Sequence, residues 1–448
     1  MSVYFAGGRV SGFGVGALAV VAVLALPGPS SAAPAAPTFA KDIAPIFQEK
    51  CEACHRPDSI APMSLETYEE ARPWARSIKA RVADRQMPPW HIDKTVGIQK
   101  FKNDRSLSDD QIATIVKWVD NGAPKGDPKD MPPARQWPDG QGWNFAAQFG
   151  QNEPDMIIRS GEFTMPAHAQ DAWDKRQMPT GITEPTWVRA IEIRPTTVKG
   201  RRITHHAIAY LQQTEPDGAP ATAFGLPAPL MEWAVGKQGE MMRPDTGKLL
   251  LPGSRITWDI HYSQAGEEIT NAVELGLYFY PRGEVPKFRT SLQLVPAALG
   301  DMDVKPNQIT VTQGNTVLRS AARIESFQAH MHLRGKAMMM EAILPTGQTQ
   351  VLSYVNNFNF NWHNTYVYSD DVAPLVPKGT VLKITAWHDN TSAKKSNPDP
   401  NQWVGWGDRT VDEMAHAWVN ITNMSDEDLQ AEIQKRRAGQ SSSTQQQQ

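Results

Sequence analysis

The first part of the chain carries apolar residues at helical spacing. Within residues 38–122 the clearest helix follows Ser108 as a predicted N-cap, places Ile115 and Val119 on its inner face, and stops at Gly122. Two earlier helices are predicted, over residues 42–50 and from the N-cap Ser64 to residue 83.

The second part of the chain changes to short runs of alternating apolar and polar residues. Turn clusters such as 281–283 and 345–347 separate these runs, a pattern typical of antiparallel β-sandwiches. A stretch rich in Pro, Gly and charge lies between the two parts and predicts a linker. Strands are predicted over residues 187–193, 255–262, 272–280, 308–311, 323–333, 380–387 and 414–421.

Composition adds two constraints. With 448 residues, of which 40% are hydrophobic, the chain can build several full cores. A formal net charge of −3 gives no reason to expect nucleic acid as a partner.

The N-terminus reads as a secretory signal. An apolar stretch over residues 12–26 is broken by Pro27-Gly28-Pro29 and followed by small residues suited to cleavage. The stretch is short for a bilayer span, and no later segment is long and apolar enough. We therefore expect an exported protein, in a bacterial periplasm or secreted, with no stable membrane span after signal cleavage.

The two cysteines of the chain both lie in the run Cys51-Glu52-Ala53-Cys54-His55. This spacing predicts covalent attachment of a c-type haem, with His55 as an axial ligand of the iron. The alternative is a redox Cys-x-x-Cys pair that happens to precede a histidine. Attachment of haem c also requires export, in agreement with the signal.

The second axial ligand of the haem has three candidates. Met87 follows the second predicted helix and precedes Pro88 and Pro89, which would hold its thioether rigidly. Met63 and His91 are the competing residues. We favour Met87.

Five of the eleven histidines fall in three groups of the β region. On a strand, residues i and i+2 share a face, so His330 and His332 should project together, opposite a core face. His205 and His206 are adjacent and should point to opposite faces. Both can reach one metal ion only where the backbone twists. His261 is the third group, whereas His168, His363 and His388 are expected to be structural or surface residues.

The residue types of these groups indicate copper. Imidazole suits copper, zinc, iron or nickel, and a thioether such as that of Met414 favours copper, above all Cu(I). The absence of nearby cysteine argues against a structural zinc site.

This pattern resembles that of the copper type II, ascorbate-dependent monooxygenases, which include peptidylglycine alpha-hydroxylating and dopamine beta-monooxygenases. The family order is a His-His pair, a His-Tyr, a His-x-His and a methionine after an acidic residue. The matching segments, within roughly residues 155–425, are His205-His206, His261-Tyr262, His330-Met331-His332 and Glu413-Met414.

The resemblance implies two separated copper ions on two β-sandwiches. One would be held by His205, His206 and His261 for electron transfer. The other, the catalytic ion, would be held by His330, His332 and Met414.

The chain also departs from the family. It has no cysteine for the disulfides of eukaryotic members. Gln328 stands where an arginine grips a peptide carboxylate, His416 replaces an asparagine, and Trp418 replaces a tyrosine. These three residues are candidate substrate contacts, and the substrate itself is not indicated.

The predicted organisation has six parts. The fold class is a small all-α cytochrome c domain followed by two antiparallel, jelly-roll-like β-sandwich domains. The parts are a signal peptide over 1–35, the cytochrome c domain over 36–125, a linker over 126–150, sandwiches over 151–296 and 297–428, and a disordered tail over 429–448.

The predicted function is a copper-dependent monooxygenase that hydroxylates a C–H bond of an organic substrate with O2. Electrons would come from a periplasmic donor through the haem. The alternative is a non-catalytic haem and copper protein for electron transfer or copper binding.

Overall fold

The structure is a computed structural model that describes residues 36–57, 59–137, 142–215, 222–223, 226–237 and 239–445. The predicted signal peptide, residues 1–35, lies outside the described residues. Within the described ranges, no helix combines the length and the apolar character that crossing a membrane requires.

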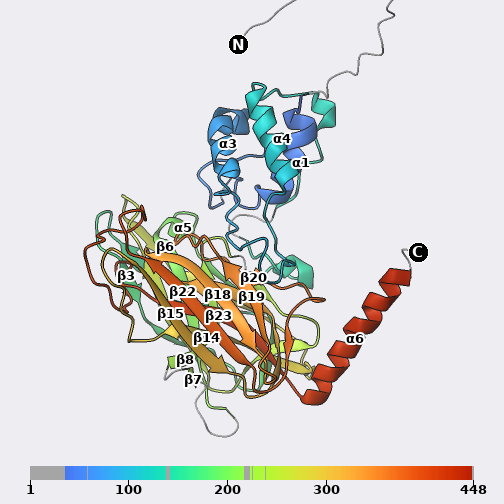
Figure 1. Ribbon diagram of the computed structural model, residues 1–448, viewed down its shortest axis with the longest axis vertical. Helices are drawn as coiled ribbons and strands as arrows, with labels where there is room; N and C mark the ends of the chain where they lie inside the picture. Colours follow the sequence, from blue (N-terminus) through green and yellow to red (C-terminus); the bar gives the residue numbers. More distant parts are fainter. Residues whose placement is uncertain are drawn as a thin grey trace, which may run out of the picture. The chain divides into compact units, whose positions relative to one another are not determined.

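Short helices occupy the N-terminal part (Figure 1). Ser108 caps α4 as predicted, because its side chain accepts a hydrogen bond from the Gln111 backbone. Thr67, rather than Ser64, caps the second helical segment. The elements are η1 (Phe39–Ile43), α1 (Ala44–Lys50), α2 (Tyr68–Ala71), η2 (Arg72–Trp74), α3 (Ala75–Ala83), α4 (Asp109–Asp120), η3 (Pro128–Asp130) and η4 (Ala146–Phe149).

The predicted fold class is wrong in its first element. The described chain is mostly β-sheet with few helices, and Pro37–Gln448 forms one compact unit from which no all-α cytochrome domain is set apart. The physical reason lies in the segment after α3. Trp90, Ile92 and Phe101 bury their side chains in a β-sandwich core instead of among the helices, and Ile92 pairs with Val355 in a β-bridge. The β-sandwich part of the prediction fits in part.

The described strands form four sheets. The largest has eleven strands: β1 (Met156–Arg159), β13 (Val273–Phe279), β5 (Thr186–Pro195), β10 (Thr246–Leu250), β14 (Phe288–Ala298), β23 (Ala415–Met424), β16 (Ala321–Ile324) and β21 (Leu375–Val376), with β9 (Glu240–Met241), β17 (Ser326–His330) and β20 (Tyr366–Val367) attached. The six-stranded sheet contains β3 (Ala172–Asp174), β11 (Arg255–Tyr262), β6 (Thr204–Gln212), β8 (Leu226–Ala234), β7 (Thr222–Ala223) and β4 (Gln177–Pro179). The four-stranded sheet contains β15 (Ile309–Val317), β22 (Val381–Asp389), β18 (Gly335–Ile343) and β19 (Thr349–Val355). The two-stranded sheet pairs β12 (Ile269–Asn271) with β2 (Phe163–Met165).

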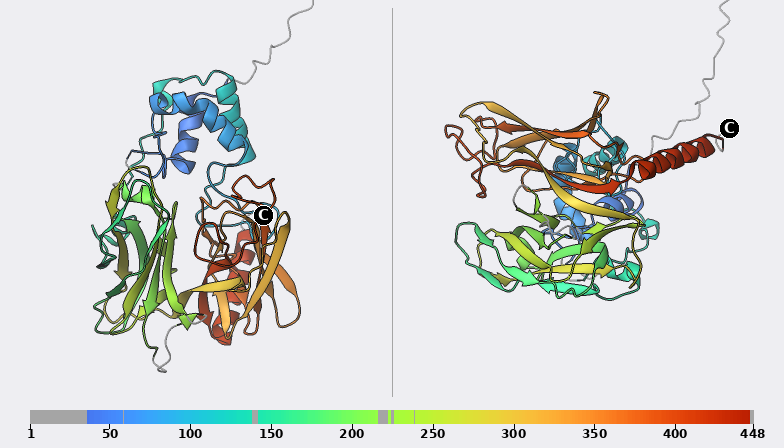
Figure 2. Two further views of the ribbon diagram at one scale, coloured as in Figure 1. Left: turned by 90° about the vertical axis from the view of Figure 1, so that its left-hand side faces the viewer. Right: turned by 90° about the horizontal axis from the view of Figure 1, so that it is seen from below.

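Two apolar cores define two sandwiches, seen in Figure 2 as the green-to-yellow and the yellow-to-red layers. The first core packs β6, β8 and β11 against β1, β5, β10 and β13. The second core packs β14, β16, β17 and β23 against β18, β19 and β22. Met338 and Met340 lie in the second core, as expected of strand residues on a core face.

The two sandwiches share one sheet across the predicted boundary at residue 296. The large sheet runs through both, because β10 pairs in parallel with β14 through Thr246 and Phe288. Strand β14 spans the predicted boundary and pairs with β23 of the second sandwich. The sequence pattern predicted two sandwich domains, whereas the large sheet continues from one sandwich into the other.

Two further segments differ from the prediction. The expected disordered tail is helical over α6 (Asp426–Gln445), and Leu429 packs against Phe288 and Met424. In the expected linker, Trp143 and Ala146 pack on the first sandwich beside Tyr278. Their apolar side chains are buried by the neighbouring sheet, which holds this segment in place.

Candidate metal centre

The first histidine set is formed by two neighbouring strands. Strand β6 follows the short helix α5 (Gly200–Ile203) and pairs with β11, and the register places His206 opposite His261. The next pair is Thr204 with Tyr262, so His205 is the extra residue of a β-bulge. This bulge supplies the backbone twist that adjacent histidines need to reach one ion.

The rings of this set are gathered. One ligand atom from each of His205, His206 and His261 lies within 4.8 Å of the others. The Nδ1 atoms of His205 and His206 are 3.2 Å apart. Two nitrogens bound to one ion at 2.0–2.1 Å each stand roughly 3 Å apart, so this spacing fits a metal site.

A carboxylate orients His261. Its Nε2 lies 3.0 Å from Oδ2 of Asp171, which also accepts a hydrogen bond from Thr410 at 2.7 Å. The ring of Trp173 stacks on His261 with centroids 4.6 Å apart. Since Asp171 engages Nε2, Nδ1 of His261 is the nitrogen left for a metal.

The sequence analysis did not identify Asp171, and Asp259, which shares β11 with His261, is not the carboxylate that pairs with the His261 ring. Asp259 instead faces Lys175, with the ammonium nitrogen 3.4 Å from a carboxylate oxygen. Asp171 precedes β3 in a segment without apolar periodicity, and only the pairing of β3 with β11 brings it near His261. No sequence pattern marks it.

The second histidine set lies on β17 and β23. Phe327, Ala329 and Met331 point into the second core, whereas the rings of His330 and His332 stand 5.6 Å apart on the other side. The predicted alternation is therefore confirmed for this pair.

His332 is oriented by the segment that contains Met414. Nδ1 of His332 lies 3.1 Å from the carbonyl oxygen of Asp412, which leaves Nε2 for a metal. The carboxylate of Glu413 accepts the backbone N–H of His332 at 2.9 Å and that of Arg334 at 2.6 Å. The Met414 carbonyl oxygen lies 3.1 Å from Nε2 of His388, so His388 is a structural histidine.

The predicted substrate contacts are buried between the sandwiches. Gln328 donates to Glu232 at 2.8 Å and accepts from Thr365. His416 stacks on His330 with ring centroids 4.5 Å apart. Trp418 packs with Ile208 and Leu292 in a small apolar cluster. These three side chains form the interface between the two sandwiches and are not open to solvent.

Burial keeps the imidazoles neutral. Desolvation lowers the pKa of His205 to about 4 and that of His416 to about 3. The same cause holds the pKa values of His206, His330 and His363 well below the ordinary range. Neutral imidazole is the form that binds metal ions.

Several ring nitrogens are buried without a hydrogen-bond partner in the described structure. They are Nδ1 of His330, Nδ1 of His388 and both nitrogens of His363 and of His416. A buried polar group left unpaired costs about 1–3 kcal/mol, so a cluster of such nitrogens fits a site built around a ligand. His363 and His416 belong to this cluster, although the sequence reading treated His363 as a structural or surface residue.

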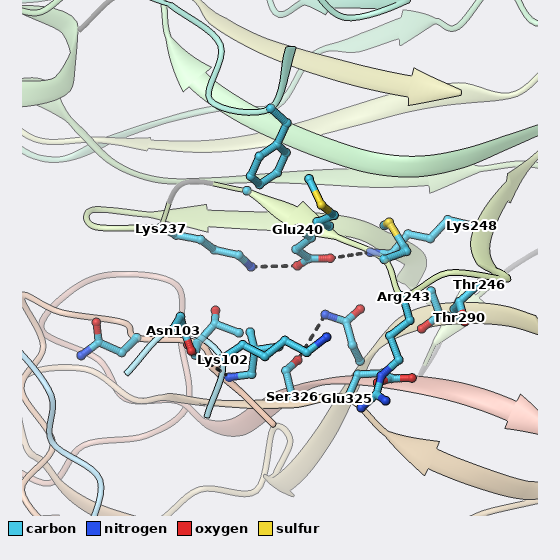
Figure 3. A pocket seen from close by; sticks show the side chains of 18 of the residues that line it. Lys102, Asn103, Lys237, Glu240, Arg243, Thr246, Lys248, Thr290, Glu325 and Ser326 are labelled. Carbon is cyan, nitrogen blue, oxygen red and sulfur yellow. Dashed lines mark hydrogen bonds and ion pairs between the residues drawn. The ribbon is translucent and has the colours of Figure 1, made fainter. Parts of the chain in front are cut away.

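A cavity of about 340 Å³ lies between side chains of the two sandwiches (Figure 3). It is lined by residues of both sandwiches, including Lys237, Glu240 and Glu325, and by His363. Glu240 accepts from Lys237 at 2.8 Å and from Lys248 at 2.7 Å, and Lys237 also lies 3.7 Å from Glu232, so the two ammonium groups face two carboxylates.

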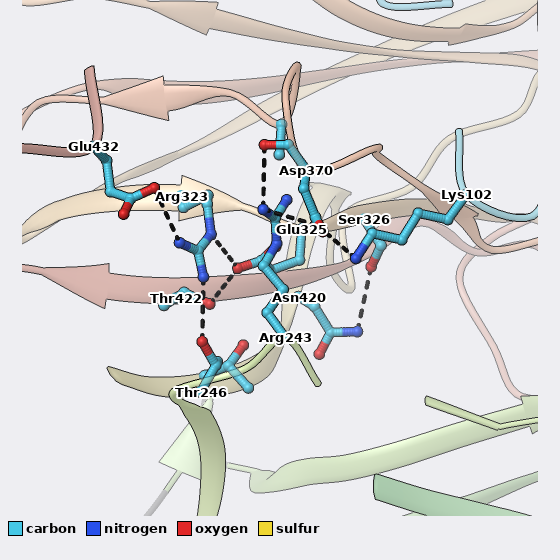
Figure 4. Close-up of polar contacts among 12 residues, drawn as sticks. Lys102, Arg243, Thr246, Arg323, Glu325, Ser326, Asp370, Asn420, Thr422 and Glu432 are labelled. Carbon is cyan, nitrogen blue, oxygen red and sulfur yellow. Dashed lines mark hydrogen bonds and ion pairs between the residues drawn. The ribbon is translucent and has the colours of Figure 1, made fainter. Parts of the chain in front are cut away.

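A partly buried ion-pair network joins the two sandwiches beside this cavity (Figure 4). Glu325 accepts from Arg243 of the first sandwich and from Arg323 of the second, each at 2.7 Å. Arg243 also pairs with Asp370 at 2.8 Å. The network fixes one sandwich against the other beside the cavity.

The predicted haem residues lie in the helical part. Cys51 and Cys54 are free thiols, and burial raises the pKa of Cys51 to about 12. Nδ1 of His55 lies 3.2 Å from the carbonyl oxygen of Met63, which leaves Nε2 free to bind iron.

The three candidates for the second axial ligand lie in different surroundings. Met87 is half-buried in the turn after α3. Met63 packs on the helical core, whereas the backbone N–H of His91 donates to Tyr366 of the second sandwich. Burial lowers the pKa of His91 to about 4.

Comparisons with known proteins do not assign the chain to a family. No family model and no curated protein matches it. The chain is similar to solved structures that include empty particles of cowpea mosaic virus (8% identity, 61% of this chain and 90% of that chain, TM-score 0.29). Others are an uncharacterized protein from Listeria monocytogenes EGD-e (10%, 61% and 20%, 0.16) and the VP2 subviral particle of infectious bursal disease virus (9%, 60% and 73%, 0.18). At these TM-scores the likenesses carry no argument about this chain.

Proposed function

We propose that the protein is an exported copper-dependent monooxygenase that hydroxylates a C–H bond with O2. The observation that carries the proposal is the convergence of His205, His206 and His261 within 4.8 Å, next to a second buried set with His330 and His332. The resemblance to the copper monooxygenases likewise implies one ligand set on each sandwich.

The donor set supports copper. Burial lowers the pKa values of His205 and His332, so these imidazoles are neutral. Met414 adds a thioether two residues after Asp412, whose carbonyl oxygen orients His332. Imidazole with thioether favours copper over magnesium or calcium, which prefer oxygen ligands. The carboxylate of Asp171 and the carbonyl of Asp412 supply the outer contacts that orient ligating rings.

The Cys51–His55 segment supports a covalent haem c. Its two thiols are unpaired, and their raised pKa values disfavour a reactive thiolate of the kind that redox Cys-x-x-Cys pairs use. The Met63 carbonyl engages Nδ1 of His55 and so selects the tautomer that presents Nε2.

Hydroxylation consumes two electrons and two protons in addition to O2, and yields the alcohol and water. Bound copper would supply one-electron chemistry at O2. The chain itself would hold the ligand rings neutral, orient them, exclude water and present the substrate from the cavity that His363 lines.

We propose that a periplasmic donor delivers the electrons through the haem. Contacts between the two regions support this route. Burial lowers the pKa of Arg201 in α5, and repulsion from Arg56, next to the axial His55, lowers it further, so these two like charges lie near each other where the helical part meets the segment before His205. Arg105 interacts with Cys54 and hydrogen-bonds the carbonyl of Gly236.

Oxygen uptake coupled to formation of a hydroxylated product tests the function. The screen would use the purified copper-loaded holoprotein with a chemically reduced donor. Met414→Ala should abolish product formation and leave the haem spectrum unchanged. Cys51→Ala with Cys54→Ala should remove turnover driven by a cytochrome donor but retain turnover driven by a small reductant. Full cytochrome-driven turnover in that double variant would refute the relay.

A non-catalytic haem and copper protein for electron transfer is the second candidate. The burial of Gln328, His416 and Trp418 favours it, because these residues leave no open substrate cleft around them. It predicts reversible copper reduction without product. The same oxygen-uptake assay therefore separates the two functions.

A further inference from the structure

One turn of the second sandwich contacts the residues that orient both histidine sets. This turn, residues 407–413, lies between β22 and β23. The hydroxyl of Thr410 donates to Oδ2 of Asp171 at 2.7 Å, and the same oxygen lies 3.0 Å from Nε2 of His261. Because Asp171 belongs to the first sandwich, the second sandwich supplies part of the contacts that orient the first set.

The other end of the turn orients the second set. Two residues after Thr410, the carbonyl oxygen of Asp412 lies 3.1 Å from Nδ1 of His332. The carboxylate of Glu413 accepts the backbone N–H of His332 at 2.9 Å. Four consecutive residues of the turn therefore hold one candidate ligand of each set.

Local contacts hold the turn in one shape. A β-bridge between Trp406 and Glu413 joins its two ends. Within the turn, the backbone N–H of Asp412 donates to the carbonyl of Arg409 at 2.9 Å, and the Arg409 guanidinium donates to both oxygens of the Asp412 carboxylate at 2.6 and 2.8 Å. Thr410 lies between these two residues, so a displacement of Thr410 also displaces Asp412.

A second contact joins the same turn to the first sandwich without involving Asp171. The ammonium nitrogen of Lys175 lies 3.3 Å from the carboxylate of Asp408. Both side chains are 50% exposed, so water screens this pair and its contribution is small. The contact that links the turn to the first histidine set is therefore that of Thr410.

We propose that turn 407–413 couples the two histidine sets, so that copper binding at one set raises the affinity of the other. This inference rests on the proposed copper function and keeps the two ions separate. Binding fixes the ring of His261, and with it the Asp171 carboxylate, Thr410 and the turn. The conformational freedom lost in that step is not lost again when His332 binds, which makes the coupling positive. Thr410 is a positioning residue, because it acts on the first set through Asp171.

Stepwise Cu(II) binding by the full chain, measured against a chelator of known affinity, tests the coupling. Electron paramagnetic resonance assigns each step, because imidazole nitrogens split the Cu(II) signal. A variant with His206→Ala and His261→Ala keeps one ligand of the first set, so it reports the affinity of the second set alone. We expect the second set to bind copper at least about 5-fold more tightly in the loaded wild type than in this variant. In a Thr410→Val background the same ratio should fall to one.

Two control variants separate coupling from packing. Thr410→Ser keeps the hydroxyl, and Asp408→Asn weakens the other contact of the turn, so both should keep the wild-type ratio. A merely structural role of Thr410 would lower the affinity of the first set and leave the ratio unchanged. A ratio of one in the wild type, or the wild-type ratio in Thr410→Val, overturns the coupling while leaving two copper sites intact. A wild-type protein that binds no copper overturns the proposed function as well.

Discussion

The two histidine sets differ in how the fold prepares them. In the first, ladder pairing, a bulge and the Asp171 carboxylate bring three rings within 4.8 Å. In the second, polar contacts hold the backbone around His332, while His330 stacks against His416 and keeps an unpaired nitrogen. The first set is organised at its side chains and the second mainly at its backbone.

This difference has a thermodynamic consequence. Rings already in ligand positions lose little conformational freedom when they bind an ion, so the first set should load first and release its ion last. The second set can alter its coordination at lower cost, because His330 and His416 are fixed by stacking alone. Under the proposed function, a centre that accepts O2 would benefit from that freedom.

The largest effect is expected at Glu413, the buried anchor of the second set. Glu413→Ala leaves the N–H groups of His332 and Arg334 without their acceptor and removes the carboxylate near the buried Arg334 guanidinium. Breaking a buried charge interaction costs about 3–5 kcal/mol. Urea unfolding of the metal-free protein should show this loss.

Glu413→Gln is the matched control, since an amide oxygen still accepts one backbone N–H; it should lose less than Glu413→Ala. At low temperature the folded Glu413→Ala protein should keep the copper of the first set and lose that of the second. A loss below about 1 kcal/mol would mean that packing alone holds His332.

Acid should weaken the metal-free protein through both sets. The pKa of His205 is about 4 in the folded chain and 6.5 without burial, so the unfolded chain binds more protons between these values. Stability is therefore lost as pH falls from about 6.5 to about 4, and His205 alone accounts for about 3 kcal/mol.

The measurement is urea unfolding of the metal-free protein at pH 7 and pH 4. His205→Asn should lose about 3 kcal/mol less stability between these values than the wild type, because the variant has no imidazole to protonate. An equal loss in both proteins would show that His205 is hydrated in the metal-free state.

The fold was predictable where a local pattern decides it. Period-two alternation placed His330 and His332 opposite Phe327 and Ala329, and the cap at Ser108 is where the pattern puts it. The separate helical domain failed because local periodicity does not report which core will bury Trp90 and its neighbours. The continuous sheet was missed for the same reason, since the pairing of β10 with β14 is a long-range contact.

The same distinction between local patterns and long-range contacts applies to the candidate site. The spacing of His205, His206 and His261 was readable, and their convergence in space agrees with it. Asp171 was not identified, and the burial of His363 among other rings was not foreseen, because both residues lie outside the regular strands and their surroundings depend on packing. Tertiary contacts alone distinguish His363 from the exposed His168.

The smallest of these effects concerns the carboxylate that orients the first set. The hydrogen bond from His261 is the main cause that lowers the pKa of Asp171 to about 2, so this group stays ionised at working pH. Asp171→Asn removes the charge and weakens control of the ring tautomer, which should reduce copper affinity about 10–100-fold.

Competition with a copper chelator measures this affinity. Asp408→Asn is the control. Asp408 is another carboxylate near this sheet; it pairs with Lys175 and makes no contact with a histidine in the described structure. It should leave the affinity unchanged. If Asp171→Asn also leaves it unchanged, the bulge and the ladder alone organise the first set. Backbone geometry would then position the ligands of both sets, and the proposed contrast between side-chain and backbone organisation would be wrong.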